Sequence, residues 1–394
     1  MWIPREIEET LTHTAGTRPA VVLTGCRQVG KTSLLARAFS DHRYVSLDVP
    51  TVAEEAEHSG EDFLRRYPPP VIIDEVQYAP VLLRHIKADI DLHREEPGRF
   101  LITGSQDFSL MAGVNESLAG RSAVLNLHSL SAREYEAWSG KPLDRTALVE
   151  WMLQGGYPEL HSRGLDAERF FSDYLATYLE RDVRTILGVR SLRDFDRFMR
   201  LCAVRTGQLV SFTALATDLG VSPNTVKSWL SVLETSRIVV LIEPYFENLG
   251  KRIVKTPKLY FLDSGLCSFL LGARTPDDLV RSPMLGALFE THVLGQFVRH
   301  FANRGLRREI YFYRDHHGQE VDFLIPTAGR FALIECKWAE SPNARQRGFE
   351  EIETLVGPDR IISRTIVTPD RGSRRASEAV TIADSVSLGF LSIA

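Results

Sequence analysis

Short apolar runs alternate with helical patterns in the first third of the chain. Each run is four to six residues long and consists mainly of aliphatic and aromatic residues. Runs of this length suit strands that are buried on both faces, and their alternation with helical stretches is typical of a doubly wound parallel sheet. The sequence therefore predicts an α/β domain with strands at residues 20–23, 44–47, 71–75, 100–105 and 123–127.

The pattern changes after residue 130 and again after residue 205. Residues 131–203 carry apolar side chains at three- and four-residue steps, which predicts a lid made only of helices, with the aromatic stripe of residues 170–178 as its core. Two short helices then flank a Gly-Val-Ser turn at residues 220–222, and two apolar runs follow, which indicates a winged helix-turn-helix. The last segment mixes one helix with several strands and predicts a smaller α/β domain.

Composition narrows the class of protein. At 394 residues the chain is too long for one core, and its 44% hydrophobic and 25% charged residues are ordinary for a globular protein. No apolar run approaches the ~18 residues of a membrane span, and the first residues lack the form of a secretion signal, so we expect a cytoplasmic protein without a membrane partner. A net charge of −4 does not indicate nucleic-acid binding over the whole surface. The four cysteines lie far apart, which predicts free thiols.

A complete phosphate-loop motif follows the first apolar run. Residues 25–32 read G-x-x-x-x-G-K-T. The two glycines let backbone N–H groups face the phosphates, Lys31 reaches the outer phosphate oxygens, and the Thr32 hydroxyl can ligate Mg²⁺. The motif predicts a site for ATP and Mg²⁺ formed by Gly25, Cys26, Arg27, Gln28, Val29, Gly30, Lys31, Thr32 and Ser33.

Two adjacent carboxylates end the apolar run at residues 71–75. Because this run follows a phosphate loop, Asp74 is expected to hold the magnesium ion and Glu75 to polarise the attacking water. The alternative is a solvated turn.

With its motifs in this order, the first third of the chain resembles the AAA-type P-loop ATPases. The resemblance implies a polar residue that senses the outer phosphate at the tip of the next strand, where Ser105 or Gln106 stands although the family more often has Asn. It also implies an arginine finger for a neighbour's nucleotide, and Arg121 precedes the following strand at that place; an ordinary surface arginine is the alternative. A finger that acts in trans requires a homo-oligomer. From the lid, Arg181 either reaches the nucleotide or pairs along its own helix.

The second helix of the helix-turn-helix begins with polar residues. Asn224, Thr225 and Lys227 are residue types that contact base edges or phosphates, which predicts a DNA partner. Docking of a protein partner is the alternative. The connector between the two following strands adds the basic residues Lys251, Arg252, Lys255 and Lys258.

Carboxylates and a lysine recur near the end of the chain. Asp322 lies in one predicted strand and Glu335 and Lys337 end the next, with a hairpin turn at residues 326–329 between them. Alternation puts Glu335 and Lys337 on one face, and the hairpin can bring Asp322 beside them. The carboxylates can then hold Mg²⁺ or Mn²⁺ while the ammonium group stabilises charge on a phosphodiester, and Glu290 on the preceding helix adds a further ligand.

This D…E-x-K arrangement behind a Glu-bearing helix resembles the PD-(D/E)XK nuclease superfamily. The motif order, including residues 260–266 (YFLDSGL), resembles the prokaryotic AAA-family ATPases that carry a C-terminal domain of unknown function. The expected fold class is therefore α/β multidomain. Its parts are an AAA-type P-loop parallel sheet at 1–130, a helical lid at 131–205, a winged helix-turn-helix at 206–265 and a restriction-endonuclease-like α/β domain at 266–394.

Two functions fit these features. One is an ATP-hydrolysing enzyme that acts on DNA, in which the nucleotide state controls access to a metal-dependent nuclease site. The other is a nucleotide-dependent switch or assembly regulator, whose terminal domains only bind protein or nucleic-acid partners.

Overall fold

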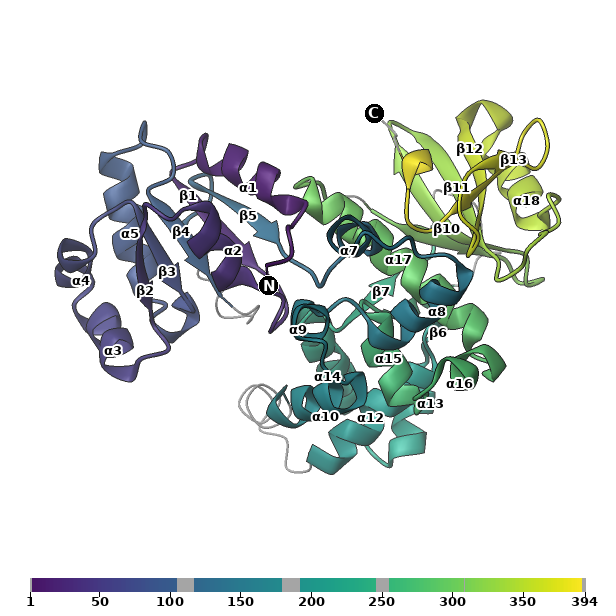
Figure 1. Ribbon diagram of the computed structural model, residues 1–394, viewed down its shortest axis with the longest axis horizontal. Helices are drawn as coiled ribbons and strands as arrows, with labels where there is room; N and C mark the ends of the chain where they lie inside the picture. The colour runs from purple at the N-terminus through teal and green to yellow at the C-terminus, as the bar shows by residue number, and fades with distance from the viewer. Residues whose placement is uncertain (1, 105–116, 179–191, 246–254, 308, 392–394) are drawn as a thin grey trace.

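The computed structural model describes residues 2–104, 117–178, 192–245, 255–307 and 309–391 (Figure 1). Five residues discussed above lie outside these ranges, namely Ser105, Gln106, Arg181, Lys251 and Arg252. Within the described part of the chain, no helix has the length and apolar content needed to cross a membrane.

The N-terminal part is a five-stranded parallel sheet, as the apolar runs predict. Its strand order is β2-β3-β4-β1-β5. The three central strands are buried on both faces, which explains why they are apolar at successive positions. The strands are β1 (Ala20–Thr24), β2 (Arg43–Ser46), β3 (Val71–Asp74), β4 (Phe100–Thr103) and β5 (Ser122–Asn126). The helices are α1 (Ile7–Ala15), α2 (Lys31–Ala38), α3 (Pro50–His58), α4 (Gly60–Arg66) and α5 (Leu82–Leu92), with a 3₁₀ turn η1 (Val76–Tyr78).

A mainly helical region follows, with one small antiparallel sheet in the order β6-β8-β7. The aromatic stripe of α10 is buried, so its assignment to the core is confirmed. Ser222 caps α14 through the Thr225 N–H, and Pro223 occupies the first helical position. The helices are α7 (Ala132–Ser139), α8 (Arg145–Gln154), α9 (Pro158–Arg163), α10 (Ala167–Tyr178), α12 (Leu192–Val204), α13 (Phe212–Leu219), α14 (Pro223–Thr235), α15 (Ser264–Leu271) and α16 (Pro276–Arg281). The strands are β6 (Gln208–Leu209), β7 (Val239–Ile242) and β8 (Lys258–Phe261).

The C-terminal part is a mixed six-stranded sheet in the order β13-β14-β12-β11-β10-β9. Strands β9, β10 and β11, which come first along the chain, form an antiparallel meander. Strand β12 follows α18 and joins β11 in parallel. Ala328 and Gly329 have positive φ and form the predicted hairpin turn. The elements are α17 (Leu285–Asn303), β9 (Tyr311–Arg314), β10 (Glu320–Thr327), β11 (Arg330–Cys336), α18 (Arg347–Val356), η3 (Pro358–Arg360), β12 (Ile361–Thr368), β13 (Arg374–Arg375), β14 (Thr381–Asp384) and η4 (Gly389–Leu391).

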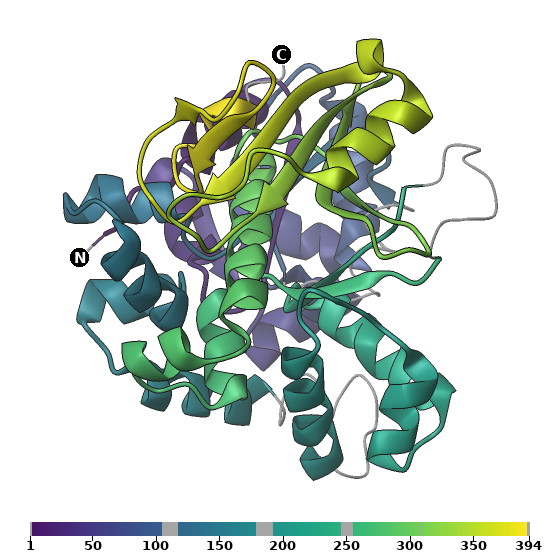
Figure 2. The same ribbon diagram turned by 90° about the vertical axis from the view of Figure 1, so that its right-hand side faces the viewer.

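Helix α17 joins the three parts of the molecule. It runs through the middle of the structure in Figure 2 and packs against α1 and β5 of the first part, α8, α15 and β8 of the second, and β11 of its own sheet. Most of its side chains are buried, including polar ones such as Gln296, Arg299 and Asn303. Because the helix is packed on several sides, both polar and apolar side chains around its circumference are buried.

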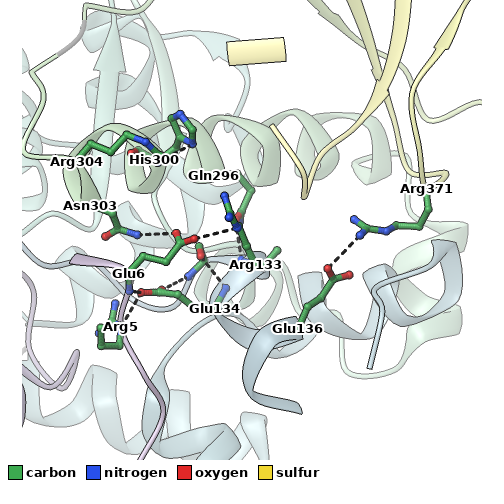
Figure 3. A network of polar contacts seen from close by, with 12 residues as sticks. Arg5, Glu6, Arg133, Glu134, Glu136, Gln296, His300, Asn303, Arg304 and Arg371 are labelled. Atoms are coloured by element: carbon green, nitrogen blue, oxygen red, sulfur yellow. Dashed lines mark hydrogen bonds and ion pairs between the residues drawn. The ribbon is translucent and has the colours of Figure 1, made fainter. Parts of the chain in front are cut away.

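Buried polar contacts connect α17 to the phosphate loop (Figure 3). The Arg5 guanidinium donates to the carbonyl of Val29 at 2.8 Å, to that of His128 at 2.7 Å, and to the Glu134 carboxylate at 3.0 Å. Glu134 caps α7, and the α7 residue Ala132 donates its N–H to the Gln296 amide oxygen at 2.8 Å. These contacts form a continuous polar junction, which we call the Arg5 junction.

Candidate nucleotide site and acidic pocket

The phosphate loop adopts a conformation that needs its glycines. Gly25 and Gly30 have φ values of 147° and 91°, and α2 starts immediately after Gly30. A Cβ atom at Gly25 would lie 2.0 Å from the carbonyl oxygen of Leu127. Only glycine therefore fits between the loop and the strand end beside it.

Lys31 lies inside the loop and binds its backbone. Its Nζ donates to the carbonyls of Gly25 and Cys26, both at 2.9 Å. Burial lowers the pKa of this ammonium group, while Cys26 and Glu75 act in the opposite direction. The ammonium group is thus held by neutral oxygens that phosphate oxygens can replace.

Thr32 and Asp74 lie side by side at the carboxyl edge of the sheet. The Thr32 hydroxyl is 3.0 and 3.1 Å from the two carboxylate oxygens of Asp74. The Tyr44 hydroxyl donates to the same carboxylate at 2.9 Å. A hydroxyl and a carboxylate in contact are the donor pair that Mg²⁺ takes in P-loop sites, so these residues fit that ion.

Thr103 positions both candidate carboxylates and was missed by sequence reasoning, which looked two residues further on. Its hydroxyl donates to Asp74 and accepts the backbone N–H of Glu75 at 3.1 Å. Glu75 has a φ of 58°, so its backbone departs from the extended conformation of β3. Gln77 donates to the Glu75 carboxylate. The available signal was that Thr103 is the polar last residue of the apolar run in β4.

The candidate arginine finger is paired within its own chain. Arg121 makes a two-fold contact with Asp91, from Nε to Oδ1 at 2.7 Å and from Nη2 to Oδ2 at 3.0 Å. Hydrogen bonding from Arg121 lowers the pKa of Asp91 to about 2. Arg121 must leave this pair before it can reach a neighbour's nucleotide.

The candidate DNA-binding face of α14 is open to solvent in part. Asn224 and Lys227 are exposed, whereas the Thr225 hydroxyl is bonded to Ser222 at 2.8 Å. The prediction that the basic residues of the connector follow a DNA backbone is wrong for Lys258. Lys258 is buried in the protein, because it is the first residue of β8, and it therefore cannot follow a DNA backbone in this arrangement.

An acidic pocket forms where α17, β8 and the C-terminal sheet meet. The pocket has a volume of about 580 Å³. The structure brings all four predicted residues of the second site to it, together with six residues that were not predicted for this site. The lining residues are Gly207, Gln208, Leu209, Lys258, Glu290, Arg314, Glu320, Asp322, Glu335 and Lys337.

The hairpin and a bulge place the carboxylates. Phe323 pairs with Ile334 across β10 and β11, so Asp322 lies next to Glu335, and the Cys336 N–H donates to Asp322 at 2.8 Å. The register of β10 against β9 shifts between Val321 and Leu324. A bulge of this kind turns neighbouring side chains toward a shared site.

Lys258 enters this pocket from the small sheet. Its Nζ lies 3.0 Å from Glu290 Oε1 and 4.0 Å from Asp322 Oδ1, and it also contacts Glu320. Burial alone would lower the pKa of Lys258, but Glu290, Asp322 and Glu320 together raise it, so the side chain is a cation. Burial, followed by repulsion from Glu290 and Glu335, raises the pKa of Asp322.

The pocket as arranged does not fit a metal ion. Among the residues that the structure describes, no group of three or more His, Cys, Asp and Glu side chains is placed to hold one. The reason is that the Lys258 ammonium lies between Glu290 and Glu320, while Lys337 binds the Glu335 carboxylate at 2.6 Å. The predicted ligands converge, but a cationic side chain is among them.

The stretch at residues 260–266 has a structural role in this geometry. Asp263 caps α15 by accepting the N–H groups of Gly265 and Leu266, and it also accepts the Gly156 N–H at 3.0 Å. Arg299 of α17 lies 3.5 Å from the same carboxylate. These contacts hold the helical region against α17.

Comparison with protein families agrees with the first site. A model described as an AAA domain matches residues 17–136. Models described as domains of unknown function, DUF8612 and DUF4143, match residues 145–277 and 285–384. The N-terminal part is an ATPase domain of the AAA P-loop type, which confirms that prediction.

Two curated proteins match most of the chain. They are uncharacterised proteins of Mycobacterium bovis and Mycobacterium tuberculosis, each 32% identical over 336 residues, which is 82% of this chain and 71% of theirs. The chain belongs to the same family as these two proteins.

Solved structures overlap with parts of the chain. The Walker-type ATPase PabY2304 of Pyrococcus abyssi has a TM-score of 0.43 at 16% identity, over 68% of this chain and 96% of that one. The RuvB Holliday junction branch migration motor of Thermotoga maritima has a TM-score of 0.32 at 15% identity, over 60% and 89%. AMPPCP-bound DnaA of Aquifex aeolicus has a TM-score of 0.30 at 16% identity, over 58% and 85%.

Proposed function

We propose that the protein is an ATP-driven enzyme that acts on DNA. In the N-terminal domain, Lys31 binds the outer phosphates and Glu75 orients the attacking water. Thr32 and Asp74 would hold Mg²⁺, which supplies charge neutralisation on the phosphates when it is bound. The contact between Thr32 and Asp74 supports this assignment.

The helical region supports contact with DNA. The order α12-β6-α13-α14-β7-β8, with β8 between β6 and β7, supports the proposal of a winged helix-turn-helix. Asn224 and Lys227 lie on the exposed start of α14, which would enter a groove of the duplex.

One observation carries the DNA-directed part of the proposal. The order α17-β9-β10-β11-α18-β12 is the order expected of a nuclease-like fold, and its Glu290, Asp322, Glu335 and Lys337 line one open pocket. The convergence of these four predicted residues in one pocket supports a phosphodiester site.

A specific observation also favours the second function. The Lys258 contacts offset part of the negative charge of the pocket and stand where a metal ion would be needed for cleavage, which favours a binding role. A nucleotide-dependent switch that engages DNA or protein without cutting would need the same ATPase domain and the same winged helix.

A cleavage and binding experiment separates these functions. Purified protein is incubated with supercoiled plasmid and Mg²⁺ or Mn²⁺, with and without ATP. Nicking that disappears in Asp322→Ala and Lys337→Ala supports the enzyme. Duplex binding that weakens steeply with salt and with Lys227→Ala, but not with the exposed control Lys141→Ala, and that occurs without nicking supports the switch. Absence of both nicking and binding contradicts the DNA-directed proposal.

We further propose that hydrolysis takes place in a homo-oligomer in which Arg121 acts on the neighbouring subunit. Lys31→Ala retains the arginine but binds ATP only weakly, and Arg121→Ala binds ATP but lacks the arginine. Each variant alone should be nearly inactive, and a mixture should regain hydrolysis because mixed neighbours contain one complete site. A mixture as inactive as its components contradicts action in trans.

A further inference from the structure

Lys258 is the most deeply buried charged side chain of the acidic pocket. It is 1% exposed, and its ammonium group lies among carboxylates from α17 and β10. The rings of Tyr260 and Phe312 flank it, with centroids 6.0 and 5.4 Å from Nζ. Such a group persists in a protein interior only when opposite charges surround it.

The lysine and the carboxylates come from different parts of the fold. Lys258 pairs with Leu209 of β6 and with Ile242 of β7, so the small antiparallel sheet fixes its backbone. Glu290 and Asp322 belong to the matched C-terminal domain at 285–384. The pocket is therefore shared between two domains, and its central cation belongs to the small sheet that packs against α14.

A second, independent feature indicates that the pocket takes a cationic ligand. Glu335 is 7% exposed and lines the pocket, and its Oε2 has no hydrogen-bond partner among the described residues. Its other oxygen binds Lys337. A buried carboxylate oxygen without a partner is costly unless a donor or a cation meets it.

The charges of the pocket fit replacement of the lysine by a divalent ion. With all four carboxyl groups in their ionised form, the cationic side chains of Lys258, Lys337 and Arg314 leave one net negative charge. Withdrawal of Lys258 would leave two, and a divalent ion balances that number.

We propose that Lys258 is a tethered cation that occupies the acidic pocket in place of a divalent ion, so that the pocket as built excludes Mn²⁺ and Mg²⁺. This inference rests on the proposed function, because it concerns what occupies the same pocket. It also explains why the predicted ligands converge without forming a metal site.

The test measures Mn²⁺ binding to the nucleotide-free full-length protein by electron paramagnetic resonance. Lys258→Met removes the cation and Lys258→Arg retains it. We expect Lys258→Met to bind one more Mn²⁺ per chain than the wild type. The affinity of its pocket for Mn²⁺ should be at least ~10-fold higher than in the wild type, because attraction between opposite charges at 3–4 Å is strong inside a protein. Lys258→Arg should behave as the wild type. Adding Asp322→Asn to Lys258→Met should remove the new ion, which places it in the pocket.

The outcomes distinguish this inference from the proposed function. If the wild type binds Mn²⁺ as tightly as Lys258→Met, and Asp322→Asn alone abolishes binding, the pocket is a metal site but Lys258 does not control it. If no variant binds Mn²⁺, the metal-dependent function fails together with the inference. Should Lys258→Met not fold, Lys258→Gln replaces it, and a melting temperature that Mn²⁺ raises in this variant but not in the wild type supports the inference. An equal rise in both overturns it.

Discussion

Two buried lysines, Lys31 in the phosphate loop and Lys258 in the acidic pocket, have partners of different charge. Lys31 donates to two neutral backbone carbonyls, which an anionic ligand can replace with stronger, charge-assisted bonds. Lys258 is bound to carboxylates, so its release separates opposite charges. The first site is therefore ready to exchange its internal contacts for a ligand, and the second is closed by its own cation.

The two sites also differ in how the chain assembles them. The loop follows the carboxyl end of β1 and Asp74 ends β3, two parallel strands on either side of β4, and this edge of the sheet is where the fold type places ligands. The pocket needs β8, α17 and the hairpin at once. The Arg5 junction lies between them and contacts both the loop and the region that supports α17. Substitutions in the phosphate loop, in the acidic pocket and in the Arg5 junction should therefore affect different measured properties.

The largest expected effect is on the junction that connects the two sites. Arg5→Met leaves the buried Glu134 without its cation and should lower the free energy of unfolding by about 3–5 kcal/mol. Chemical denaturation measures this difference. Arg133→Met is the matched control, because Arg133 pairs with Glu6 at a more exposed position and should cost about 1 kcal/mol or less. Equal losses in the two variants would mean that the junction carries no special stability.

Glu75→Gln should separate binding from chemistry at the first site. The amide cannot take a proton from water, so ATP hydrolysis should fall on the order of 10³-fold while ATP affinity stays near the wild-type value. Steady-state turnover and equilibrium binding of a fluorescent ATP analogue measure the two quantities. The exposed Glu95→Gln is the control. Turnover retained in Glu75→Gln would assign the water to another residue.

The contrast between the sites explains which features the sequence predicts. The parallel sheet and the phosphate loop follow from contiguous motifs, because backbone conformation and burial act on neighbouring residues there. The hairpin turn at residues 326–329 and the Gly-Val-Ser turn at residues 220–222 are equally local and were predicted. The role of Thr103 was not predicted, because its contacts to Asp74 and Glu75 depend on the pairing of β3 with β4, which the sequence pattern does not show.

Long-range pairs leave no local pattern. Lys258 was interpreted as part of a basic connector because three other basic residues precede it, although it also begins the apolar run that forms β8. Its place among Glu290 and Glu320 depends on how two domains pack. The Arg5 contact to Glu134 spans 129 positions, and only the cap at Ser131 is visible in the sequence.

Removal of the first lysine should have the opposite effect to removal of the second. Lys31→Ala deletes a buried ammonium that phosphate oxygens would bind, so the affinity for ATP should fall roughly 100-fold, as expected for the loss of charge-assisted hydrogen bonds. The same titration with Lys141→Ala, a change at an exposed lysine, should match the wild type. If Lys31→Ala bound ATP as tightly as the wild type, the contrast would fail, because Lys31 would then not recruit a ligand while Lys258 takes the place of one.

The smallest expected effect concerns acid. Burial, reinforced by Arg299, Arg237 and Arg5, lowers the pKa of His128 well below its ordinary value of 6.5, so the folded protein holds this side chain neutral beside the Arg5 junction. Below pH 6.5 the unfolded chain binds a proton that the folded chain does not, and the free energy of unfolding should fall by up to about 1.4 kcal/mol per pH unit. His128→Gln should flatten this slope in denaturation series between pH 7 and pH 5, whereas a change at the exposed His58 should not. An unchanged slope in His128→Gln would mean that other groups, away from the junction, set the sensitivity to acid.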